Sequence, residues 1–193
     1  MEKVKFRDLL SRGDMTYALR TTLFLIFAIF VCYLQCSVTV FADSGNLLGN
    51  GSFENGLAPA VGYGSTISES ESYYRNGCHS CKVTQAGNYG ALYVPVAMQN
   101  GKTYSYSAWV RYDPNSPAGQ GICLAFIASN GAVQTVLATS PTLNKMDDWT
   151  KITGTFQMQQ DLQNQFLSFY VNPGNGLQTF YVDNMELKEI VAP

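Results

Sequence analysis

Two carboxylates occupy similar surroundings near opposite ends of the chain. Glu54 follows Phe53 in a short hydrophobic segment, and Asp183 lies between Val182 and Asn184 in a second one. Both segments have a strand-like pattern, and antiparallel pairing of the first with the last would bring the two carboxylates together. Calcium prefers oxygen ligands of this kind. We therefore expect a structural calcium ion between Glu54 and Asp183. The alternative is that Glu54 caps a turn and Asp183 pairs with a lysine.

A period-two alternation of apolar residues recurs through most of the chain, with turn-forming Gly, Pro, Asn and Ser clusters between the runs. The runs cover residues 82–83, 91–96, 103–112, 121–128, 133–138, 149–158, 166–171 and 178–190. Many short strands without a helical period predict an all-β fold, specifically an antiparallel β-sandwich.

The same alternation assigns side chains to strand faces. Trp109 and Arg111 share one face with serines, opposite an apolar face of tyrosine, alanine and valine. In a later strand, Tyr170 lies opposite Leu167 and Phe169. Each strand thus places an aromatic ring among polar groups on a face away from the core. Rigid rings with polar tips suit the apolar faces and hydroxyl rims of sugars, so we expect a carbohydrate site.

Five segments, in the same order along the chain, resemble carbohydrate-binding modules of families 4, 9 and 22. They are the opening segment from residue 46, residues 77–84, 101–111 and 149–156, and the closing segment at 180–184. The resemblance covers about residues 46–190 and implies a jelly roll of the galactose-binding-domain type. It also implies that backbone carbonyls near Ser52 and Lys82 assist Glu54 and Asp183 in holding calcium.

Family 22 modules add further candidates by position. Their aromatic residue that stacks on xylan corresponds to Tyr89, and their hydrogen-bonding acid corresponds to Asn172, which is an amide here. Near Gln134 the family has an aromatic residue that this chain lacks, and Tyr63 is the nearest substitute for a missing tryptophan. Resemblance and alternation together give a predicted sugar site of Tyr89, Tyr170, Asn172, Trp109, Arg111 and Gln134.

The first 42 residues differ in composition from the rest. Five basic residues precede an apolar run at 23–34, and a small-residue site for cleavage follows at 40–42. This pattern predicts a secretory signal peptide at 1–42, whose true start could be Met15, followed by one module at 43–193. The apolar run is shorter than the roughly 20 residues of a spanning helix. Extracellular secretion from a bacterium is therefore favoured over anchoring by an uncleaved leader.

The charge of residues 43–193 bears on the choice of partner. These residues include 7 basic and 11 acidic side chains, a formal charge of −4. Nucleic acids and anionic membranes call for clustered cations, so we expect a neutral polysaccharide or oligosaccharide as ligand and a monomeric protein.

The same part of the chain holds three cysteines, at positions 78, 81 and 123. Cys78 and Cys81 point to opposite faces of an extended strand, and His79 is the single histidine, which argues against zinc. A small buried residue or a bridge between Cys78 and Cys123 is favoured.

No paired carboxylates of a glycosidase and no nucleophile motif stand out in the sequence. We therefore expect a secreted, non-catalytic module that binds a polysaccharide of the xylan or β-glucan class through exposed aromatic rings. Two alternatives stay open. One is a cell-surface or assembly protein that uses the same sandwich for protein contacts, and the other is an isolated module or truncated piece from a glycoside hydrolase system.

Overall fold

The computed structural model describes residues 45–116, 121–140, 148–171 and 177–191. These residues form ten strands and one short 3-10 helix, η1 (Ser129–Gly131), and no α-helix. The strands are β1 (Val61–Tyr63), β2 (Ser65–Ser70), β3 (Ser80–Gln85), β4 (Ala91–Val96), β5 (Thr103–Tyr112), β6 (Ile122–Ala128), β7 (Val133–Thr139), β8 (Thr150–Gln157), β9 (Gln165–Val171) and β10 (Thr179–Glu189).

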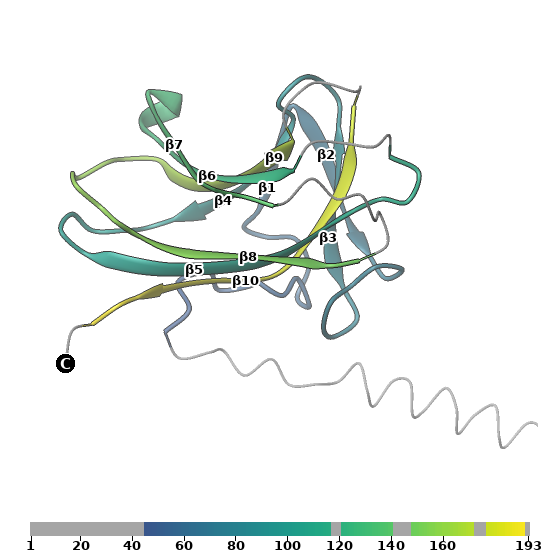
Figure 1. Ribbon diagram of the computed structural model, residues 1–193, viewed down its shortest axis with the longest axis horizontal. Coiled ribbons are helices and arrows are strands. Elements are labelled where there is room, and N and C mark those ends of the chain that lie inside the picture. The colour runs from purple at the N-terminus through teal and green to yellow at the C-terminus, as the bar shows by residue number, and fades with distance from the viewer. Residues whose placement is uncertain (1–44, 117–120, 141–147, 172–176, 192–193) are drawn as a thin grey trace, which may run out of the picture. The chain divides into compact units, whose positions relative to one another are not determined.

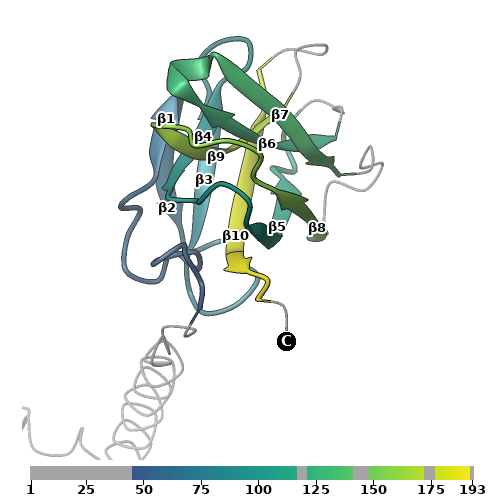
Figure 2. The same ribbon diagram turned by 90° about the vertical axis from the view of Figure 1, so that its left-hand side faces the viewer.

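The strands pack as two five-stranded antiparallel sheets (Figure 1). Sheet A has the order β1-β4-β9-β6-β7, and sheet B has the order β2-β3-β10-β5-β8. Figure 2 shows sheet B running from β2 and β3 through β10 to β5 and β8. Strands that neighbour each other in a sheet are mostly distant in sequence, as in a jelly roll. The predicted all-β sandwich is confirmed.

All eight expected runs form strands, with ends shifted by at most two residues. The sequence did not reveal β1 and β2. β2 lies at the edge of sheet B, pairs only with β3, and consists mainly of serine, threonine and glutamate. Edge strands of this kind need no apolar face, so the alternation that marks the others is absent. The opening segment, expected to be a strand, consists of turns and bends in the structure.

The main core lies between the inner faces of the two sheets. Val110 and Val182 of sheet B and Leu124 and Phe169 of sheet A are fully or almost fully buried there. Full burial of such a side chain contributes about 1.5–3 kcal/mol relative to exposure. The face assignments made from alternation are confirmed, because Val110 and Phe169 belong to this core whereas Trp109 and Tyr170 do not.

The opening segment is held against β10 by hydrogen bonds at both of its ends. Leu47 N donates to the carbonyl oxygen of Leu187 at 2.8 Å, and Met185 N donates to the carbonyl oxygen of Gly51 at 2.8 Å. The Asn46 side chain accepts from Leu187 N and donates to the Met185 carbonyl. A Cβ atom at Gly51 would clash with that Met185 carbonyl, so this close approach requires glycine. The two ends of the domain therefore meet, as expected.

One of the two expectations for the cysteines, a bridge between Cys78 and Cys123, is contradicted. Cys78 is disulfide-bonded, whereas Cys81 and Cys123 are buried thiols. A bridge between Cys78 and Cys123 is therefore wrong, and a bonded Cys78 leaves no thiolate there for zinc. Cys81 packs in the core, and burial raises the pKa of its thiol to about 12. The thiol therefore stays protonated and unreactive at neutral pH.

The predicted signal peptide, residues 1–42, lies outside the described residues, and its cleavage stays a prediction. Within the described ranges, no helix is long and apolar enough to span a membrane.

Candidate functional site

The outer face of sheet A, turned away from the core, carries aromatic rings beside small side chains. In one row of the sheet, Tyr170 lies between Ala91 and Cys123. In the next row, Ser168 lies between Tyr93 and Ala125. The side chains of three rows across this face are Tyr63, Ala91, Tyr170, Cys123 and Thr139, then Val61, Tyr93, Ser168, Ala125 and Val136, then Pro95, Phe166, Ile127 and Gln134. None of these side chains carries a charge at neutral pH.

Rings on this face form two contacting groups. Tyr63 and Tyr93 stack with a centroid distance of 5.0 Å and an interplanar angle of 6°, and Phe166 lies 5.4 Å from Tyr93. Tyr89 contacts Tyr170 at 6.3 Å with a tilt of 58°. Tyr63 and Tyr89 are 62% and 56% exposed, respectively. Each group therefore presents one ring to solvent and supports it with a more buried one.

The position of Tyr89 depends on a buried amide, Gln85, at the end of β3. Its Nε2 donates to the carbonyl oxygens of Gly90 at 2.9 Å and Val171 at 3.2 Å, and its Oε1 accepts from Gln178 N at 3.0 Å. Gln85 thus ties the loop that carries Tyr89 to the end of β9, next to Tyr170. Its sequence signal, a single amide at the end of a short mixed strand, was too weak to identify this role.

Tyr170 and Gln134 join Tyr89 on the outer face of sheet A. Burial raises the pKa of the Tyr170 hydroxyl, and a hydrogen bond with the Gln134 side chain opposes this increase. Tyr170 is only 6% exposed, which corrects the expectation of an exposed ring. Small neighbours at Ala91, Cys123 and Ala125 let the sheet side of Tyr170 pack closely, and Tyr89 contacts its ring. Tyr170 thus belongs to the buried layer of this face that supports Tyr89.

Trp109 and Arg111 lie on the opposite side of the sandwich, on the outer face of sheet B. Trp109 pairs with Asp183 and Arg111 pairs with Tyr181 on β10. The structure therefore does not bring them to Tyr89, Tyr170 and Gln134. Alternation places a side chain away from the core but does not say which sheet its strand joins. Asn172 lies outside the described residues.

The carboxylates of Glu54 and Asp183 both bind backbone N–H groups of the loop before β3. Glu54 accepts from Cys78 N and His79 N, at 3.0 and 2.9 Å to its Oε1. Asp183 Oδ2 accepts from Arg75 N at 2.7 Å. Asp183 is fully buried, and burial raises its pKa to about 6, to which the charge of Glu54 contributes. The two carboxylates are thus close enough to repel each other.

These carboxylates fit a calcium ion in donor chemistry. No ion pair to Asp183 occurs among the described residues, so a cation would relieve a buried negative charge. The described part of the chain has no cluster of three His, Cys, Asp or Glu side chains suited to a metal. Further ligands would therefore have to be other oxygens, such as the backbone carbonyls expected near Ser52 and Lys82. The Lys82 ammonium itself lies on the outer face, 6.0 Å from the Tyr181 ring.

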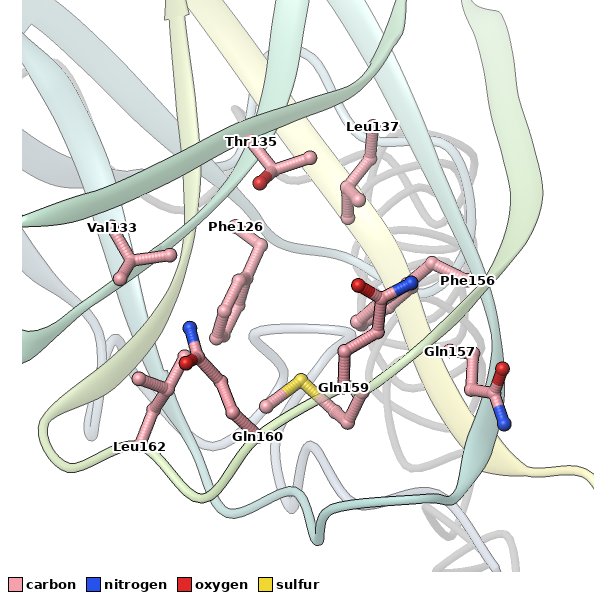
Figure 3. A pocket seen from close by; sticks show the side chains of 10 residues that line it. Phe126, Val133, Thr135, Leu137, Phe156, Gln157, Gln159, Gln160 and Leu162 are labelled. Atoms are coloured by element: carbon pink, nitrogen blue, oxygen red, sulfur yellow. The ribbon is translucent and has the colours of Figure 1, made fainter.

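A separate pocket of about 240 Å³ opens between the sheets beside the edge strands β7 and β8 (Figure 3). Phe126, Phe156 and Leu137 form apolar walls, and Gln159 and Gln160 extend along its rim. None of the predicted site residues lines it. The pocket therefore does not contribute to the candidate face on sheet A.

Comparison with known proteins identifies the family. The family model described as a carbohydrate binding domain matches residues 45–176. The chain belongs to this family. No curated protein matches this chain by sequence.

Solved structures share the fold of this carbohydrate-binding domain. A xylan-binding domain of carbohydrate-binding module family 22 has a TM-score of 0.63 and 13% identity, covering 76% of this chain and 96% of that one. A second family 22 xylan-binding domain, from Paenibacillus barcinonensis, has a TM-score of 0.59 and 22% identity, covering 72% and 98%. A family 16 module has a TM-score of 0.54 and 22% identity, covering 74% and 99%. The resemblance drawn from the sequence is confirmed.

Replacing Gln85 tests its positioning role in the carbohydrate-binding domain. In Gln85→Met, two carbonyls and one N–H lose their buried partner, so we expect a loss of about 3 kcal/mol in the free energy of unfolding. Urea unfolding measures this loss. Gln159→Met, at an exposed amide, is the matched control and should change stability by less than about 0.5 kcal/mol. Equal effects of the two substitutions would contradict the role of Gln85.

Asp113 gives a prediction for acid stability. Burial raises the pKa of Asp113, but hydrogen bonds from the Tyr181 hydroxyl, at 2.6 Å, and from Asn115 outweigh it, so the pKa is lowered. A lowered pKa stabilises the fold above the unfolded value of about 3.9, and this contribution is lost as the pH falls through the folded value. We expect Asp113→Asn to cost about 2 kcal/mol at pH 7 and much less near pH 2. Chemical unfolding at both pH values measures it, with the exposed Asp161→Asn as control, and a pH-independent cost would contradict the assignment.

Proposed function

We propose that this domain binds a neutral polysaccharide of the xylan or β-glucan class on the outer face of sheet A. The observation that carries the proposal is an uncharged face on which two exposed tyrosines, Tyr63 and Tyr89, are each backed by another ring. Membership of a carbohydrate-binding family supports it. So do the similar structures described as xylan-binding domains.

Binding would use both the apolar C–H faces and the hydroxyl groups of the sugar. The rings of Tyr63 and Tyr89 would cover the apolar C–H faces of pyranose units, because their backing by Tyr93 and Tyr170 fixes them at little conformational cost. Gln134 and other polar groups of the face would bond hydroxyls. The uncharged face favours a neutral polysaccharide, because a charged group of the ligand would lose hydration there without gaining a partner of opposite charge.

Removing an exposed ring should weaken polysaccharide binding. We expect Tyr89→Ala and Tyr63→Ala each to reduce affinity for xylan or β-glucan about 10-fold, a loss of about 1.4 kcal/mol, because each removes a stacking surface. Affinity electrophoresis against xylan, β-glucan, cellulose and mannan measures the change and identifies the preferred chain. Tyr74→Ala is the matched control, because Tyr74 is also an exposed tyrosine but lies in the loop before β3, outside this face.

Two outcomes would overturn the sugar proposal. One is a wild-type protein that no polysaccharide retards. The other is unchanged retardation in both tyrosine variants. If the same variants instead abolish self-association in sedimentation measurements, the face serves protein contacts, as in the alternative of an assembly protein.

We also propose that the domain is secreted, monomeric and non-catalytic. A binding role needs none of the paired acids that glycoside hydrolysis requires. A module of this kind would catalyse no reaction itself. It would act by holding the protein, or a partner enzyme system, at the polysaccharide.

We further propose a structural calcium ion held by Glu54 and Asp183 with nearby backbone carbonyls. The raised pKa of buried Asp183 supports this, because a bound cation would stabilise its charged form. The ion would supply a cross-link between the opening segment and β10. Its role would be structural, because both carboxylates bind a loop at the end of the sandwich rather than the face on sheet A.

Calcium should raise thermal stability. A ligand that binds only the folded state stabilises it by about 2.7 kcal/mol at 100 times its Kd, so we expect EDTA to lower the Tm by several degrees and added calcium to restore it. Asp183→Asn keeps a side-chain oxygen acceptor but loses the charge, and it should remove the calcium response. Glu186→Gln, at an exposed acid on the same strand, is the control. A Tm that EDTA leaves unchanged would contradict the proposal.

A further inference from the structure

Three cationic side chains lie against aromatic rings on the outer face of sheet B, opposite the proposed polysaccharide face. The pairs are Arg75 with Trp109, Arg111 with Tyr73, and Lys82 with Tyr181, at 4.3, 4.2 and 6.0 Å from the ring centroids. We call these six residues the cationic cluster. Stacked cations and rings of this kind are attracted by the ring quadrupole, so the cluster has a defined geometry.

The strands set the spacing of the cluster. Tyr181 on β10 pairs with Lys82 on β3 and with Arg111 on β5, so the two cations flank its ring in one row of the sheet. Two strand spacings separate their backbones by about 10 Å. Tyr73 packs on Tyr181 with a centroid distance of 5.0 Å and a tilt of 58°. The ring at the centre therefore has a positive charge on either side.

The loop before β3 completes the cluster and is firmly held. The Ser80 hydroxyl donates to the carbonyl oxygen of Tyr73, and Arg75 N donates to buried Asp183. The cations are therefore presented on a fixed frame rather than on a free loop.

The positive charge of the cluster is largely without a counterion. None of its three cations forms an ion pair with another residue in the described ranges. Lys82 helps to lower the pKa of Asp113, whose carboxylate already accepts from the Tyr181 hydroxyl and from Asn115. The domain as a whole is acidic, so this concentration of unpaired cations is a local feature.

The Arg111 guanidinium is not neutralised by the described residues of the domain itself. Its Nε is buried and has no hydrogen-bond partner in the part of the chain that the structure describes. The two terminal nitrogens of a guanidinium stacked on a ring can still donate at its outer edge, and such a pair of donors matches the two oxygens of a carboxylate. The geometry therefore favours an anionic ligand at this outer edge.

We propose that the cationic cluster binds the carboxylates of an acidic polysaccharide, such as one containing uronic acid residues. Arg111 and Arg75 supply the forked donors, Lys82 supplies a third positive charge, and the partly exposed rings of Tyr73 and Trp109 contact the sugar. The site rests on the family membership of the domain and not on the proposed neutral site, because it lies on the other sheet. The two outer faces thus bind different classes of glycan.

Affinity electrophoresis with polygalacturonate tests this site, with xylan as the neutral polymer and polyphosphate as a polyanion without carboxylates. We expect polygalacturonate to retard the wild type in low salt and polyphosphate to do so much less. Arg111→Gln should reduce the retardation at least 10-fold, and Arg111→Lys should restore only part of it because it lacks the fork. Lys102→Gln is matched in charge, and because Lys102 already pairs with Glu189 at 2.7 Å, it should bind like the wild type.

Separate readouts keep the two sites and the fold apart. Arg111→Gln should retain the wild-type Tm and its behaviour on xylan, and Tyr89→Ala should retain its behaviour on polygalacturonate. If Arg111→Gln does not fold, Arg75→Gln, at an exposed arginine, replaces it with the same expected loss. The proposal is overturned by a wild type that polygalacturonate does not retard. Folded arginine variants that still bind like the wild type, or equal retardation by polyphosphate, overturn it as well.

Discussion

The attachment of the opening segment to β10 is the constraint on which the rest of this domain depends. Hydrogen bonds from Leu47 to Leu187 and from Met185 to Gly51 fix the segment along β10, within and just after the irregular pairing between Asp183 and Glu186. Glu54 and Asp183 then hold one loop from two directions through its backbone N–H groups. Such contacts between segments distant in sequence determine how the loops at one end of the sandwich are placed.

That arrangement separates two surfaces of opposite chemistry. The outer face of sheet A is uncharged and aromatic. A hydrogen bond from the buried Gln85 amide holds the loop that carries Tyr89 against this face. The outer face of sheet B carries cations stacked on rings, and one of them, Arg75, belongs to a loop held by Asp183. The inward side chains of both sheets form one shared core, so the two outer faces can differ in chemistry. One face presents uncharged aromatic rings, and the other presents positively charged side chains.

Much of the fold was predictable from local pattern. Alternation located eight strands and the inward faces, because a half-buried strand must alternate. It missed β2, whose edge position needs no apolar side. Of the predicted sugar residues, Tyr89, Tyr170 and Gln134 meet on one face, whereas Trp109 and Arg111 lie on the other. Alternation distinguishes inside from outside, and it contains no information about sheet membership.

The sequence by itself determined the fold class, the inward and outward side chains, the family and the meeting of the chain ends, because these depend on periodicity and on motifs of a few residues. Only the tertiary structure decided that Tyr170 is covered, that Tyr63 stacks on Tyr93, and that Arg75 joins Trp109. Each of these depends on which distant strands become neighbours and on how loops fold over them. Such contacts are set by long-range packing of the whole chain, so they leave no local signal in the residues that make them.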